Sequence, residues 1–110
     1  MKKCYISGPI SGYDYSERKS LFLSIQQQLE DKGYQVCSPI FNGLPENAPY
    51  TDHIRADVKM LCDCDTIVML PNWNHSMGCV QEFNVALAIG CEVKFVQSIT
   101  PLIIIETKFE

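Results

Sequence analysis

The clearest indication of the architecture comes from residues 65–90, DTIVMLPNWNHSMGCVQEFNVALAIG. Its continuous apolar run at 66–70 predicts a strand covered on both faces, as in the centre of a parallel sheet. Polar residues at 71–75 predict a loop, and the hydroxyl of Ser76 is typical of a helix N-cap. The helix that follows is expected to bury Cys79, Phe83, Ala86, Leu87 and Gly90.

The segments on either side repeat this alternation of strand and helix. Strands are expected at 3–7, 34–37, 92–96 and 102–105, and helices at 16–32 and 52–62. Ser16 and Thr51 are expected to cap the two helices. Residues 97–101 are too few for a helix, so the last two strands are adjacent or bent into one another. The order predicts one domain over residues 1–110, an α/β fold of the small doubly wound, flavodoxin- or Rossmann-like kind, with a parallel five-stranded sheet and helices on both faces.

Two segments leave alternatives open. Residues 38–50 hold three prolines and no apolar period, so they form either a lid over a pocket or a variable connection. The apolar strand at 102–105 is either an inner strand or a subunit contact.

Composition and charge narrow the class of partner. The chain has 110 residues with 46% hydrophobic and 20% charged residues, which is ordinary for a globular domain. The net charge of −4 and the scattered lysines and arginines argue against nucleic-acid binding, because phosphates require clustered positive charge. No apolar run is long enough for a signal peptide or a membrane span. We therefore expect a cytoplasmic protein whose partner is a small molecule, not a nucleic acid or a membrane.

The six cysteines are expected to be free thiols. Cys62 and Cys64 form a C-x-C pair beside two aspartates, which could suggest a metal. No second pair of cysteines or histidines follows at zinc spacing, so neither a metal nor a cofactor is expected.

Two carboxylates lie on the flanks of predicted helix faces. In an open α/β sheet, ligands bind beyond the carboxyl ends of the strands, where residues 8–13, the start of the second helix and the 72–76 loop should meet. Asp57 and Glu82 are each spaced at the edge of a buried stripe, so each is either solvent-facing or held for a purpose. His53 is expected to be an exposed polar residue.

A combination of motifs resembles the nucleoside 2-deoxyribosyltransferase family. The motifs are Y-I-S-G-P-I-S-G near the start, Asp57 upstream of D-T-I-V-M-L, and S-x-G-x-x-x-E followed by A-x-x-x-G. The N-W-x-x-S-x-G run before the glutamate is similar to short deoxyribosyltransferase-like domains of bacteria and phages, which are related to 2′-deoxynucleoside 5′-monophosphate N-glycosidases. The resemblance covers residues 4–96.

The resemblance implies a reaction at an N-glycosidic bond. Glu82 would be the nucleophile that attacks the anomeric carbon of a 2′-deoxyribosyl group and forms a covalent intermediate. Asp57 would be the acid/base that handles the proton of the departing base. The alternative is a nucleotide-binding protein on the same fold, a sensor or a sequestering protein without turnover.

The resemblance also implies a set of substrate-binding residues. Ser76 lies six residues before Glu82, roughly 9 Å along a helix, which is comparable to a sugar with its 5′ substituent. A serine at 76 favours a 5′-phosphate, whereas Ser11 stands where the monophosphate hydrolases have an arginine. Trp73 would frame the base or merely cover the strand end. A homo-oligomer is implied as well, and the full set is Gly8, Pro9, Ile10, Ser11, Gly12, Tyr13, Asn72, Trp73, Ser76 and Gly78.

Overall fold

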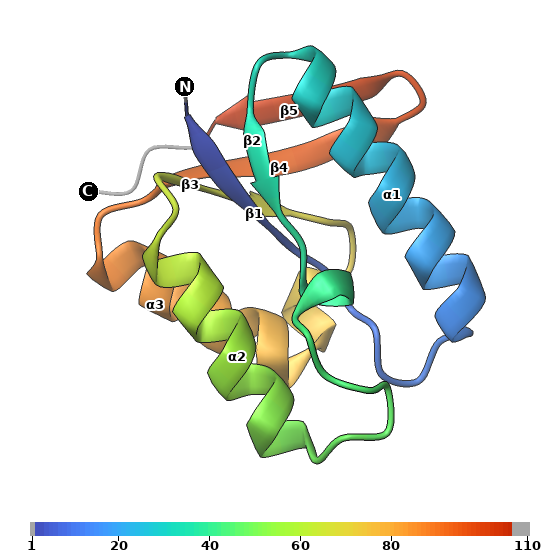
Figure 1. The fold of residues 1–110 in the computed structure, drawn as a ribbon. Coiled ribbons are helices and arrows are strands. Elements are labelled where there is room, and N and C mark those ends of the chain that lie inside the picture. The colour runs from blue at the N-terminus through green and yellow to red at the C-terminus, as the bar shows by residue number, and fades with distance from the viewer. Residues whose placement is uncertain (1, 107–110) are drawn as a thin grey trace.

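The structure is a computed structural model that describes residues 2–106 (Figure 1). One five-stranded sheet, in the order β2-β1-β3-β4-β5, forms its centre. The strands are β1 (Lys3–Ser7), β2 (Gln35–Cys37), β3 (Thr66–Met69), β4 (Glu92–Ile99) and β5 (Leu102–Glu106). The helices are α1 (Tyr15–Asp31), α2 (Tyr50–Cys62) and α3 (Met77–Ala88), with 3₁₀ turns η1 (Pro39–Phe41) and η2 (Trp73–His75).

The sheet is mixed, which corrects the expectation of a wholly parallel sheet. β1, β2, β3 and β4 pair in parallel, whereas β5 runs antiparallel to β4. A parallel neighbour would require a crossover of a dozen or more residues, and only Thr100 and Pro101 separate β4 from β5. The alternative of adjacent strands is confirmed, and β5 is an edge strand.

Helices cover both faces of the sheet, as the sequence predicts. α1 packs on one face and α2 and α3 on the other (Figure 1). On the first face, Phe22 and Ile25 of α1 pack in one buried cluster with Val68. On the second face, the buried cluster joins residues of α2, α3 and the strands: Tyr5, Leu61, Ile67, Met69, Cys79, Ala86 and Val93.

Helix starts differ from the expectation in two of three cases. Ser76 caps α3 as predicted, since its Oγ accepts a hydrogen bond from the Cys79 amide at 3.3 Å. The cap of α1 is Asp14, not Ser16, because the Asp14 carboxylate already accepts from Glu17 N. α2 starts after Pro49 and has no side-chain cap, so the prediction for Thr51 was wrong.

The carboxyl ends of β1 and β3 approach each other closely. Leu70 N donates to Ser7 O at 2.8 Å. A Cβ on Gly8 would lie 2.5 Å from Leu70 Cδ1, so only a glycine fits there. The close approach places the loop after β1 beside the loop after β3, at the carboxyl ends of the strands, where ligands bind in such folds.

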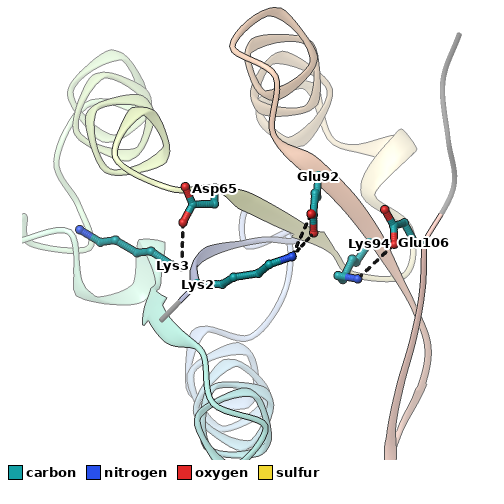
Figure 2. Close-up of polar contacts among 6 residues, drawn as sticks. All are labelled: Lys2, Lys3, Asp65, Glu92, Lys94 and Glu106. Atoms are coloured by element: carbon teal, nitrogen blue, oxygen red, sulfur yellow. Dashed lines mark hydrogen bonds and ion pairs between the residues drawn. The ribbon is translucent and has the colours of Figure 1, made fainter.

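The opposite end of the sheet, where β1 and β4 begin, carries two ion pairs. Lys2 Nζ lies 2.8 Å from the Glu92 carboxylate, and Lys94 Nζ lies 3.6 Å from that of Glu106. Figure 2 draws both pairs. All lie near the amino ends of β1 and β4, away from the loops described above. The Lys2–Glu92 pair is exposed, and such a pair contributes little to stability. Neither pair belongs to the site described below.

Among residues 2–106, no helix is both long and apolar enough to cross a membrane. The six cysteines are all free, and Cys4, Cys64 and Cys79 are buried. The expectation of free thiols is therefore confirmed.

Candidate active site

A cavity of about 710 Å³ lies at the carboxyl ends of the parallel strands. Its walls come from the loop after β1, the segment between β2 and α2, and the first turns of α2 and α3. The 38–50 segment lines the cavity through Pro39, Ile40, Asn42, Leu44, Glu46, Ala48 and Tyr50. Of the two alternatives for this segment, the structure favours the one that places it over a pocket.

Glu82 lies in the cavity wall and is almost fully buried, with 4% of its surface exposed. Tyr5 OH donates to its Oε2 at 2.6 Å, and Ser7 Oγ donates to its Oε1 at 2.8 Å. Burial raises the pKa of Glu82 to about 7, the bonds from Tyr5 and Ser7 oppose that rise, and the charge of Asp57 adds to it. The carboxylate is therefore fixed at both oxygens and poorly solvated.

Asp57 reaches the same cavity from α2. It is 9% exposed, which decides against the solvent-facing alternative. Its Oδ1 accepts a hydrogen bond from Asn42 Nδ2 at 2.9 Å. Burial raises the pKa of Asp57 to about 6; the hydrogen bond from Asn42 acts to lower it, as does the charge of the His53 ring in any state in which that ring is protonated. Two partly desolvated carboxyl groups thus share one cavity, an arrangement that separates acid from base in many enzymes.

The structure brings together all but one of the residues that the sequence indicated. Asn72 lines the cavity in a left-handed conformation (φ 67°), which asparagine tolerates better than most residues. Ser76 and Gly78 line it at the start of α3, where free amides and the helix dipole favour an anionic group. The loop after β1 contributes the rest: Gly8, Pro9, Ile10, Ser11, Gly12 and Tyr13.

Trp73 is the exception. Its ring does not line the cavity and packs instead on Phe83 and Phe95, with ring centroids 4.7 and 5.9 Å away. The structure therefore matches the alternative in which Trp73 covers the end of the strand.

Sequence reasoning missed several polar residues of the site. Tyr5 and Ser7 could have been found, because residues two apart on a strand face the same side and both carry hydroxyls in an apolar strand. His53 could also have been found, since it lies four residues before Asp57 on the same face of a helix. Asn42 lies in an irregular segment, and no periodicity indicates where its side chain points.

Tyr50 was also missed, and it links the two helices that carry the carboxylates. It is the first residue of α2, and its hydroxyl donates to Gln81 Oε1 of α3 at 3.1 Å. A Cβ on Gly78 would lie 3.4 Å from this hydroxyl. The absence of a side chain at 78 thus leaves room for Tyr50 beside the N-terminus of α3.

The charge of the cavity is mostly acidic. Its lining includes Glu46, Asp57, Glu82 and two histidines, and among residues 2–106 no lysine or arginine lines it. Nor does this part of the chain place three or more histidine, cysteine or acidic side chains where they could hold a metal ion. The arrangement suits acid–base and nucleophilic chemistry by carboxyl groups on a small molecule.

Solved structures with the same fold act on nucleosides and nucleotides. A 2-deoxyribosyltransferase of Bacillus psychrosaccharolyticus is 23% identical, with a TM-score of 0.65 over 84% of this chain and 70% of that one. The CMP N-glycosidase BcmB of Clostridium botulinum is 18% identical, with a TM-score of 0.61 over 86% of this chain and 70% of that one. A deoxyribosyltransferase of Leishmania mexicana is 19% identical, with a TM-score of 0.67 over 87% of this chain and 64% of that one.

These likenesses confirm the resemblance at the level of the fold, which is that of the nucleoside 2-deoxyribosyltransferases. Within this fold, the chain belongs to the family described as a domain of unknown function, DUF4406, whose model matches residues 2–95. A search of curated proteins gives no match.

Proposed function

We propose that the protein cleaves or transfers at the N-glycosidic bond of a 2′-deoxynucleoside or its 5′-monophosphate, through a covalent deoxyribosyl ester on Glu82. The observation that carries the proposal is the Glu82 carboxylate, which is buried at the cavity wall and held by Tyr5 and Ser7. Burial of this carboxylate disfavours its charged form and so destabilises the fold, which supports a functional role for Glu82 and not a purely structural one. The shared fold with enzymes of this kind supports the same reaction class.

In the first step, a Glu82 oxygen attacks C1′ of the sugar. The C1′–N bond breaks, its electron pair remains on the base, and Asp57 donates a proton to the base. In the second step, water or a second base attacks C1′, the ester C–O bond breaks, and Asp57 takes up the proton released by the attacking group. Water gives hydrolysis and a second base gives transfer.

The remaining cavity residues suit the two ends of the substrate. The N-terminus of α3, with Ser76 and Gly78, would receive the 5′ end of the sugar. Tyr13 and Asn72 would border the base. Several large apolar side chains around the cavity are exposed, which supports a homo-oligomer: Tyr13, Phe41, Leu44, Tyr50 and Met77. A monomeric mass in solution would contradict the oligomer.

Incubation with deoxynucleosides and their monophosphates, with and without an acceptor base, tests the proposal. We expect the wild-type protein to release base, and Glu82→Ala to lose at least about 1,000-fold in rate, because removal of a nucleophile abolishes the covalent route. Trapping of the deoxyribosyl ester with a 2′-fluorinated substrate, followed by peptide mass measurement, would locate it on Glu82.

Glu30→Ala serves as the matched control, since Glu30 is an exposed glutamate on the opposite face of the sheet. Tight nucleotide binding by the wild-type protein without release of any base would reject the enzyme and favour a nucleotide-binding protein.

A further inference from the structure

The side chain of Asn42 joins the segment over the cavity to the candidate acid. Leu44 N donates to Asn42 Oδ1 at 3.0 Å. A backbone amide can only donate, so this contact identifies the oxygen of the Asn42 amide and fixes the orientation of the group. Its nitrogen therefore points away from Leu44, with two hydrogens to donate.

These two hydrogens have two acceptors. Asn42 Nδ2 lies 2.9 Å from Asp57 Oδ1 and 2.9 Å from His53 Nδ1. The other ring nitrogen, His53 Nε2, lies 3.2 Å from the carbonyl oxygen of Glu46, which can only accept. The network is fully satisfied when His53 is neutral with its hydrogen on Nε2, because Nδ1 then accepts from Asn42.

We propose that His53 is a positioning residue for the reaction: as the Nε2-protonated imidazole it fixes residues 42–46 over the cavity and, through Asn42, orients the carboxyl group of Asp57. The inference rests on the proposed function of Asp57 as the acid. With Oδ1 bonded to Asn42, Oδ2 is the oxygen left to serve the departing base. The Nδ1-protonated tautomer would direct a hydrogen at the Asn42 NH₂ group and break the contact through which His53 holds Asn42 against Asp57.

The tautomer can be measured without turnover. The chain has two histidines, so a long-range ¹H–¹⁵N correlation spectrum of labelled protein contains two imidazole patterns, and the one lost in His53→Asn belongs to His53. We expect the pattern of a neutral ring protonated on Nε2. A ring protonated on Nδ1 would overturn the proposal, whatever the activity.

Two substitutions each preserve half of the network. His53→Asn keeps an acceptor at the δ position, facing Asn42, and loses the bond to Glu46. His53→Gln can still donate to the Glu46 carbonyl but loses the hydrogen bond with Asn42. We expect His53→Asn to keep kcat within about threefold, and His53→Gln to lower it about 10- to 100-fold with a smaller change in KM, because the acid is misplaced.

Asn42→Ala should lower kcat as His53→Gln does. The double variant Asn42→Ala/His53→Gln should lose no more kcat than either single variant, since both substitutions act on one contact. Lys59→Gln, an exposed change on the same helix, is the control. Equal kcat values for the two His53 variants, or additive losses in the double variant, would overturn the positioning role. Absence of base release by the wild-type protein would instead reject the proposed function, and the tautomer measurement would still decide whether His53 holds the segment.

Discussion

The Glu82 side chain is buried, and the proposed mechanism requires it to be ionised. Its ordinary pKa is 4.5 and burial raises it to about 7, so the folded state binds the proton more tightly than the unfolded state does. The stability associated with this group is therefore fully present below about pH 4.5 and is lost as the pH rises through 7. A shift of this size corresponds to about 3 kcal/mol at alkaline pH.

Glu82→Gln should consequently stabilise the protein at pH 8. We expect the free energy of unfolding to rise by as much as about 3 kcal/mol there, and by less than about 1 kcal/mol at pH 5, because an amide carries no charge to bury. Urea unfolding of both proteins at the two pH values measures the difference. The exposed change Glu30→Gln is the control, and an equal gain at pH 5 and pH 8 would contradict the assignment to ionisation.

The two carboxyl groups also predict the pH dependence of turnover. The proposed reaction requires Glu82 ionised and Asp57 protonated, but the pKa of Glu82, about 7, lies above that of Asp57, about 6. With one proton shared between them, a difference of one unit leaves the productive form at about one in ten. We expect a bell-shaped profile of kcat/KM with its maximum between these two values.

The same profile in Asp57→Asn provides the contrast. With only Glu82 left to titrate, activity should be lower, should rise with pH and should then stay level. A wild-type profile that lacks one limb, or an alkaline limb that persists in Asp57→Asn, would contradict these roles.

Among the elements, the β4–β5 hairpin depends on one side chain of α1. Gln28 Nε2 donates to Ile99 O at 2.8 Å, and Gln28 Oε1 accepts from Leu102 N at 2.8 Å. The amide thus satisfies one backbone group at the end of β4 and one at the start of β5. It joins α1 to the antiparallel edge of the sheet.

Gln28→Ala should therefore destabilise the fold by about 1–3 kcal/mol, because two partly buried backbone groups lose their partner. Urea unfolding measures the loss. Gln27→Ala is the matched control, since Gln27 is the neighbouring residue of the same type and is exposed. Equal losses in the two variants would show that helix propensity, not the hairpin contact, causes the effect.

For the whole molecule, the sequence was sufficient where local pattern decides structure. The apolar run 66–70 and Ser76 predicted the central strand and the capped helix, and the spacing of Glu82 placed it beside the buried face. The direction of β5 was mispredicted although the sequence contained the reason, because the segment between the last two strands is too short for the crossover that a parallel neighbour requires. Asn42 differs, since its role follows from the tertiary fold that brings an irregular segment against α2, and no local pattern reports that contact.

The packing of Trp73 has a practical consequence. The chain contains one tryptophan, and its indole lies in the turn between Asn72 and Ser76, both of which line the cavity. Fluorescence excited in the red part of the indole band therefore comes from this turn alone. The emission spectrum supplies an unlabelled titration signal for any compound that shifts the ring against Phe83 and Phe95.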